Sequence, residues 1–112
     1  MSAIDEYRSF QGTAGFVLFS GISGLNGIDA KEVFFAVRDE VLDGIDYLTP
    51  GARYRSKHLC GDVLWSILAT RGLHSAIGIC VSFLVKHGVV PLVCVTPVHL
   101  PNKLYSLKAP IR

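Results

Sequence analysis

SKHLCGDVLWSILATRGLHSAIGICVSFLVKHG, residues 56–88, begins the stretch 56–108 around which the rest of the chain is organised. Two apolar segments flank Ala69-Thr70-Arg71-Gly72, so the pattern predicts a helix over 56–68, a turn over 69–72 and a second helix over 73–87. Gly88 stands where a glycine commonly ends a helix, after Lys86 and His87 at the negative end of the helix dipole. The stretch therefore predicts a pair of helices joined by a tight turn.

Two strand-like segments follow this helix pair. VVPLVCVT (89–96) is rich in β-branched residues, and KLYSLK (103–108) has an imperfect alternation, with residues 97–102 as the tip between them. Pro91 removes a backbone donor, which favours an edge position or a strand that starts just after it. The order is helix, turn, helix, hairpin, with residues 109–112 as a tail.

Upstream of the pair, residues 29–42 form the clearest amphipathic helix. Asp29 can cap it, Glu32 three residues later completes a capping box, and Gly44 ends it. The residues expected to face the core recur at helical spacing: Ala30, Val33, Phe34, Val37 and Val41. The outer face is mostly acidic and is expected to point away from any nucleic acid. Residues 44–51 then form a connector, and 53–57 a short strand.

The N-terminal segment has weaker patterns. Residues 1–13 show no clear period and are interpreted as a loose arm. GFVLFSGI (15–22) is short, apolar and aromatic, which favours a buried strand. The glycines of 21–27 make a loop without the lysine of a phosphate-binding P-loop. We therefore expect a single domain over 1–112, with an arm and strand over 1–28 and a core over 29–108.

Composition limits the class of protein. The chain has 112 residues, 50% of them hydrophobic and 18% charged, which suits one domain with a solid core and some apolar surface left for a partner. Asp5 and Glu6 precede any apolar run, unlike in a secretory signal, and the uncharged 73–85 segment is too short to span a bilayer. We expect a cytoplasmic protein that does not bind membranes.

The cysteines and histidines do not indicate a metal site or another cofactor. Cys60, Cys80 and Cys94 are odd in number and widely spaced within apolar runs, which is typical of reduced core residues. His58 and Cys60 are the only near pair of metal-ligand types, and H-x-C alone does not make a zinc motif.

The most informative number is the charge of each half. Residues 1–50 carry eight acidic and three basic side chains, a net charge of −5, whereas residues 51–112 carry one acidic and eight basic side chains, a net charge of +7. The basic half also holds all four histidines: His58, His74, His87 and His99. This asymmetry indicates a polyanion partner, although scattered lysines and arginines also serve solubility alone.

The helix expected over 73–87 is apolar around most of its circumference. Its narrow polar or small line consists of Arg71, His74, Ser75, Gly78, Ser82 and Lys86, at steps of three and four residues. That line either enters a groove of a partner or merely borders solvent, and the wheel does not decide between the two. Trp65 and Phe83, on the apolar sides of the two helices, are expected to be mostly buried core anchors.

The order of elements over about residues 29–108 resembles that of the winged helix-turn-helix family. The resemblance implies a small α+β domain of three helices plus a C-terminal hairpin, here with an extra N-terminal strand or arm, and it implies duplex DNA as the partner. In that family the second helix of the pair enters the major groove and the hairpin contacts the DNA beside it. Carried over, the nucleic-acid-binding residues are Arg53, Arg55, Lys57, Arg71, His74, Ser75, Ser82, Lys86, His99, Asn102 and Lys103.

Three classes of function compete. The leading hypothesis is a small DNA-binding protein, such as a transcription regulator, that forms a homodimer to match a two-fold DNA site. The alternative is a protein-interaction module or small inhibitor that binds its partner through apolar surface. An enzyme ranks third: His58 near Cys60, or Asp62 near either of them, could form a nucleophile pair, but no acid/base motif supports it. We therefore expect a protein without catalytic activity.

Overall fold

The computed structural model describes residues 2–22, 25, 27–96 and 103–108, with the side chains of 27–29 left out. Within that part of the chain there are six α-helices, one 3₁₀ helix and a two-stranded antiparallel sheet, which confirms the predicted α+β class. The elements are α1 (Ala3–Gln11), α2 (Ala14–Ser20), α3 (Gly27–Gly44), the 3₁₀ helix η1 (Ile45–Tyr47), α4 (Ser56–Cys60), α5 (Asp62–Thr70), α6 (His74–Lys86), β1 (Leu92–Cys94) and β2 (Tyr105–Leu107).

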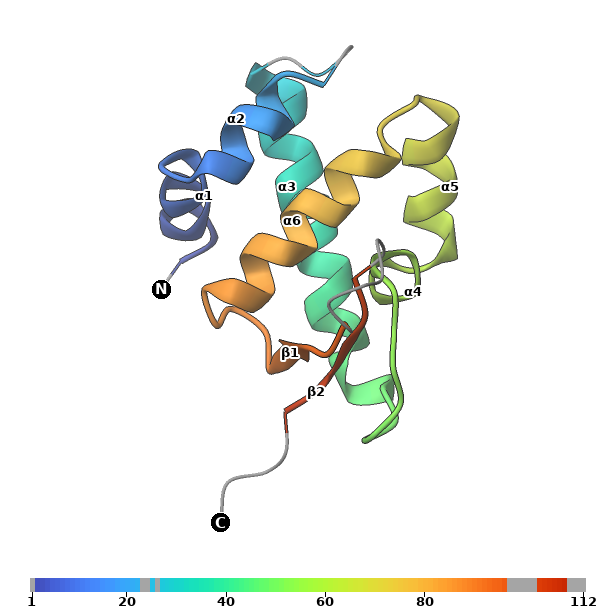
Figure 1. Cartoon of the computed structure of the whole chain (residues 1–112). Coiled ribbons are helices and arrows are strands. Elements are labelled where there is room, and N and C mark those ends of the chain that lie inside the picture. Colours follow the sequence, from blue (N-terminus) through green and yellow to red (C-terminus); the bar gives the residue numbers. More distant parts are fainter. Residues whose placement is uncertain (1, 23–24, 26, 97–102, 109–112) are drawn as a thin grey trace.

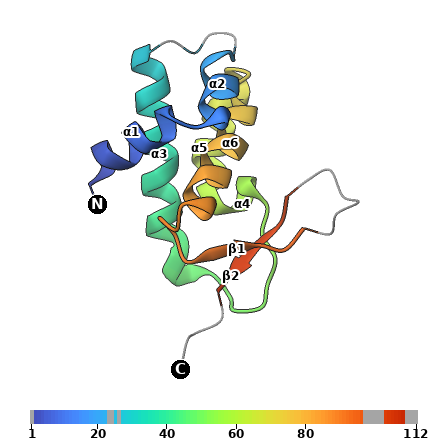
Figure 2. The ribbon, with the colours of Figure 1, turned by 60° about the vertical axis from the view of Figure 1, so that its left-hand side comes forward.

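The helices α3 and α6 cross at the centre of the molecule, with α1 and α2 on one side of the crossing and α4 and α5 on the other (Figure 1). The β1–β2 pair lies below the C-terminal half of α6, as the turned view shows (Figure 2). The core forms where these elements meet, because α3 and α6 are the two helices with several fully buried side chains each. Among them are Phe34, Val37, Val41, Ile77, Val81 and Leu84.

The C-terminal half of the helix pair agrees with the sequence-based prediction. The helix expected over 73–87 is α6, one residue shorter at each end. Gly72 and Gly88 both have positive φ, 72° and 70°, a conformation that glycine adopts without a steric penalty. In each case the next amide closes the preceding helix: Leu73 N donates to Leu68 O at 2.8 Å, and Val89 N donates to Leu84 O at 2.9 Å.

The first helix of the pair was predicted as one segment over 56–68, and this is wrong. Gly61 has φ 83° and ψ 154°, so the chain breaks into α4 and α5 and changes direction there. After this break, Val63 and Ile67 of α5 point outward, with exposed fractions of 76% and 53%. A glycine with positive φ interrupts a helix, whereas a glycine that keeps the helical conformation only lowers the stability of the helix.

The N-terminal predictions are also wrong, because residues 1–28 contain neither a loose arm nor a strand where the structure describes them. Ser2 caps α1, accepting a hydrogen bond from the Asp5 amide at 3.2 Å, and Thr13 caps α2 through the Phe16 amide at 3.2 Å. The buried side chains Tyr7, Phe10 and Phe19 fix both helices to the core. Two caps and helically spaced aromatics outweigh the β-propensity of a short apolar run.

The hairpin is present but shorter than predicted. Leu92 pairs with Leu107, Val93 with Ser106 and Cys94 with Tyr105. The strand β1 starts directly after Pro91, which was one of the two positions expected for this proline. The strand predicted over 53–57 is reduced to one isolated bridge, in which Tyr54 pairs with Tyr105. Because Ser56 and Lys57 already belong to α4, that segment has no length left for a strand.

Four smaller expectations have mixed outcomes. The helix expected over 29–42 is α3, which extends further at both ends, and its five predicted core residues are all buried, while the Asp29 cap lies outside the described side chains. Phe83 is buried as expected, but Trp65 is only partly buried. Cys94 is exposed and not in the core. None of the helices in the described ranges has the length and apolarity that crossing a bilayer requires.

Candidate nucleic-acid interface

The Tyr54–Tyr105 bridge brings basic residues from distant parts of the sequence together. Tyr54 N donates to Tyr105 O at 2.7 Å, and Tyr105 N donates to Tyr54 O at 2.8 Å. The bridge therefore holds the start of α4, with Arg55 and Lys57, against the segment that leads from Lys103 into β2. Lys103 and Tyr105 are two residues apart in an extended segment, so their side chains project from the same side.

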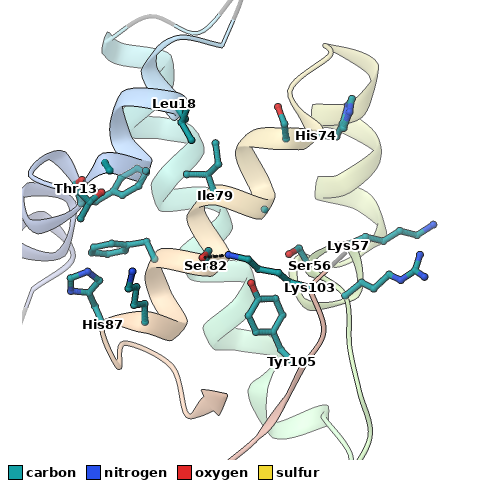
Figure 3. Close-up of a pocket in the computed structure, with 18 of the residues that line it drawn as sticks. Thr13, Leu18, Ser56, Lys57, His74, Ile79, Ser82, His87, Lys103 and Tyr105 are labelled. Atoms are coloured by element: carbon teal, nitrogen blue, oxygen red, sulfur yellow. Dashed lines mark hydrogen bonds between the residues drawn. The ribbon is translucent and has the colours of Figure 1, made fainter. Parts of the chain in front are cut away.

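A groove with a volume of about 660 Å³ runs along the exposed side of α6 (Figure 3). We call it the α6 groove. Its floor is α6 itself, one wall is formed by α1, α2 and the turn between them, and the other by α4, α5 and the strand segment around Tyr105. The floor residues are His74, Ser75, Gly78, Ile79, Ser82, Phe83, Lys86 and His87; one wall has Phe10, Thr13, Ala14, Gly15 and Leu18; the other has Arg55, Ser56, Lys57, Trp65, Lys103 and Tyr105.

The charged residues of the α6 groove are all of one sign. Four cations line it, Arg55, Lys57, Lys86 and Lys103, and no Asp or Glu appears among its described lining residues. Two imidazoles, His74 and His87, add further donors. Without carboxylates to neutralise them, these cations create a positive potential that the walls of the groove focus.

The floor of the groove contains five of the six residues of the polar line that the helical wheel predicted, all except Arg71. His74 and Ser75 are exposed, Gly78 leaves the middle open because no heavy atom lies within 4 Å of where its Cβ would be, and Ser82 is partly buried. Lys103 Nζ donates a hydrogen bond to Ser82 Oγ at 3.0 Å, so the strand segment reaches across to α6 (Figure 3). His87 stacks on Phe83 with ring centroids 4.3 Å apart.

One polar atom at the edge of the floor has no hydrogen-bond partner among the described residues, the hydroxyl oxygen of Tyr105. The side chain is 1% exposed, and burial raises the pKa of Tyr105 to about 12, an effect that the neighbouring Ser82 hydroxyl only partly opposes. Leaving a buried hydroxyl unsatisfied costs about 1–3 kcal/mol. Such a group is an exception that asks for an explanation.

The predicted nucleic-acid-binding residues are distributed unevenly. The α6 groove brings together Arg55, Lys57, His74, Ser75, Ser82, Lys86 and Lys103. Arg53 and Arg71 are exposed but lie outside its lining, and His99 and Asn102 lie outside the described residues.

Sequence reasoning missed several lining residues. They are the whole α1–α2 wall, Ser56, Gly78, His87 and Tyr105. The alternation of Lys103 with Tyr105 was the signal that could have indicated Tyr105, because the two side chains share one side of the strand.

The residues considered for catalysis do not form an active pair. The Cys60 thiol is buried, contacts the carbonyl oxygens of Lys57 and Gly61 at 3.6 Å, and has its pKa raised to about 11 by burial, so it stays protonated at neutral pH. His58 is exposed and accepts a hydrogen bond from the Arg55 amide at its Nδ1, at 3.4 Å. In the described part of the chain no cluster of three His, Cys, Asp or Glu side chains is placed to hold a metal ion.

No family model matches this chain, and no match was found among curated proteins or solved structures.

Proposed function

We propose that this protein binds duplex DNA through the α6 groove, as a small non-catalytic regulator in the cytoplasm. The observation that carries the proposal is the meeting of Arg55, Lys57, Lys86 and Lys103 in one groove whose described lining holds no carboxylate. A phosphate backbone is the polyanion that such a set of cations suits, and lysine and arginine contacts to phosphate supply most of the affinity in this kind of binding.

The order of elements adds support for the winged helix-turn-helix assignment. From α3 onward the chain has a helix, the extended bridge residue Tyr54, a broken helix, a tight turn, α6 and an antiparallel hairpin. In this assignment α6 takes the position of the helix that faces the major groove, and the segment with Lys103 belongs to the wing. The acidic outer face of α3 contributes no residue to the α6 groove, so it does not repel the phosphates there.

Phosphate contacts dominate the proposed complex. Gly78 offers no side chain to a base edge, and Ser82 is engaged by Lys103. Of the side chains on the predicted polar line of the helix, Arg71 is the one that can make a bidentate contact to guanine. We therefore expect strong salt dependence and a modest preference among DNA sequences.

The test is duplex binding across a salt series for the wild type, Lys57→Ala, Lys103→Ala and Arg71→Ala, with Lys31→Ala on α3 as the control. With four cations at phosphates, the logarithm of the binding constant should fall against the logarithm of salt with a slope of roughly −3 to −4. Lys57→Ala and Lys103→Ala should each reduce that slope by about 1 and weaken all sequences alike. Lys31→Ala should leave both the salt slope and the affinity for duplex DNA unchanged.

Arg71→Ala separates readout of bases from contact with phosphate. At a base edge its loss costs about 1–3 kcal/mol and relaxes preference at one position, whereas at a phosphate it weakens every duplex equally. Absence of duplex binding at low salt, or binding that none of Lys57→Ala, Lys103→Ala and Arg71→Ala changes, contradicts the proposal.

A second candidate function has its own observation in support. Val17 and Leu18 are neighbours on α2 with exposed fractions of 70% and 69%, and Val63 and Ile67 are exposed on α5. Exposed apolar side chains on each of these helices are candidates for a protein-binding surface. In this alternative the partner is another protein, and its affinity changes little with salt because apolar contacts release no condensed counterions.

A further inference from the structure

We propose that the α6 groove contains a pocket for a small organic anion, with the acidic group of the ligand bound by Tyr105, Ser82 and Lys103 and its apolar body resting on Ile79 and Leu18. This pocket does not rest on the binding of DNA, because its ligand is recognised by one acidic group and one compact apolar body. The volume of about 660 Å³ lies within the range of roughly 300–1,000 Å³ that is usual for small-molecule sites.

The first argument is the unsatisfied hydroxyl of Tyr105. The side chain is 1% exposed and lines the groove, and its hydroxyl has no partner among the described residues. A tyrosine hydroxyl can donate one hydrogen bond, and an anionic oxygen is the strongest acceptor that a ligand offers. A ligand oxygen at this position would satisfy the one buried side-chain nitrogen or oxygen that has no hydrogen-bond partner among the described residues.

The second argument is charge. Lys103 is an exposed lysine whose ammonium ends 3.0 Å from Ser82 Oγ, beside Tyr105 (Figure 3). A hydroxyl is a weaker partner for an ammonium than an anion is. An incoming acidic group can therefore displace the Lys103–Ser82 hydrogen bond, pair with the ammonium and reach both hydroxyls. No carboxylate among the described lining residues competes for that ammonium.

The third argument is the apolar surface on the other side of Ser82. Leu18 from α2 and Ile79 from α6 lie there, with Lys103 and Tyr105 on the opposite side (Figure 3). Gly78 keeps the intervening floor open, since nothing lies within 4 Å of where a Cβ would be. A ligand with a compact aromatic or aliphatic body next to a phosphate or carboxylate matches this combination of surfaces.

The experiment uses the full chain without DNA and four probes: phenyl phosphate, benzoate, inorganic phosphate and phenol. Amide chemical shifts followed during titration report both the affinity and the residues affected. We expect phenyl phosphate or benzoate to bind in the millimolar range or tighter and to shift Ser82, Lys103 and Tyr105. Inorganic phosphate and phenol should bind more weakly, because each supplies only half of the recognised chemistry. The stronger of the first two probes tells whether the acidic group is a phosphate or a carboxylate.

Tyr105→Phe should weaken the better probe about tenfold or more, since a hydrogen bond to a charged group is lost. Tyr47→Phe, at a tyrosine that is 88% exposed and outside the groove, is the matched control and should change nothing. Lys103→Gln is the second variant, placed at an exposed position so that folding is preserved, and it should weaken the anionic probes without affecting phenol.

Equal affinity of the better probe for the wild type and Tyr105→Phe overturns the proposal. So does a set of shifted amides that excludes Ser82, Lys103 and Tyr105, or equal affinity for phenol and phenyl phosphate. Because no DNA is present, failure of these titrations leaves the duplex-binding proposal standing, and failure of duplex binding leaves the pocket standing.

Discussion

The two walls of the α6 groove are built from opposite halves of the chain and differ in chemistry. The α1–α2 wall comes from the half with net charge −5, yet it contributes only uncharged residues to the groove, Leu18 and Thr13 among them. The other wall and the floor come from the half with net charge +7 and contribute all four cations. The acidic half therefore closes the groove without adding a carboxylate to its described lining, although the overall charge of the chain is only +2.

The walls are also held in different ways. The α1–α2 wall is anchored by side chains in the core, above all by Phe10, which contacts the rings of Phe19, Phe34 and Phe83 at centroid distances of 5.0–5.1 Å. The cationic wall also has buried side chains, among them Leu59 and Leu68, and to these it adds the paired backbone hydrogen bonds between Tyr54 and Tyr105. Substitutions should consequently affect stability on the first wall and ligand binding on the second.

The largest expected effect is that of Phe10→Ala, which removes the side chain that anchors the apolar wall in the core. Phe10 has no exposed surface, so the substitution should lower the free energy of unfolding by about 3–5 kcal/mol, measured by urea denaturation. Ser9→Ala, at the exposed neighbouring position on α1, is the control and should cost less than about 0.5 kcal/mol. A loss below about 1 kcal/mol in Phe10→Ala would mean that α1 is not part of the cooperative core.

The next effect concerns the exposed apolar side chains of the same wall. If Val17 and Leu18 bind a second copy of the chain, the double substitution Val17→Ser and Leu18→Ser should convert a homodimer into a monomer without lowering the free energy of unfolding of the subunit by more than about 1 kcal/mol. Light scattering over a concentration series measures the change in mass. A wild type that is monomeric throughout excludes the homodimer, and an unchanged dimer mass in the variant assigns the interface to another surface.

The fold could be predicted from sequence wherever several local signals coincide. For α6 an apolar period and a glycine at each end gave the correct bounds to within one residue, and the hairpin followed from β-branched residues after Pro91. Steps of three and four residues also placed four of the predicted site residues, His74, Ser75, Ser82 and Lys86, on one side of α6, where they line the groove. These predictions needed only neighbours in sequence.

The predictions were wrong where tertiary contacts decide the structure, or where a helix cap was given too little weight. Whether Gly61 merely weakens a helix or breaks it depends on its φ, which the sequence does not give. The segment with Phe16 and Phe19 has strand propensity, but Thr13 caps it as a helix and α6 supplies the surface on which it packs. Glutamate is usually found at the protein surface, but Glu6 is buried in an ion pair with Arg38, thirty-two residues away. That contact also fixes α1 on α3.

The smallest expected effect is a change in the pH dependence of stability, and it tests the buried hydroxyl on the cationic wall. Burial raises the pKa of Tyr105 from 10.0 to about 12, so between these values the unfolded chain releases the phenolic proton while the folded chain retains it. The unfolded state then binds fewer protons, and stability falls as pH rises from 10 to 12, a contribution fully present below pH 10. Near pH 10.5 the loss should be on the order of 1 kcal/mol or less. Tyr105→Phe should lack this part of the alkaline decline in urea unfolding, whereas Tyr47→Phe should retain it. Parallel pH profiles for the wild type and Tyr105→Phe would mean that the hydroxyl reaches water in the folded state, which would remove the first argument for the anion pocket.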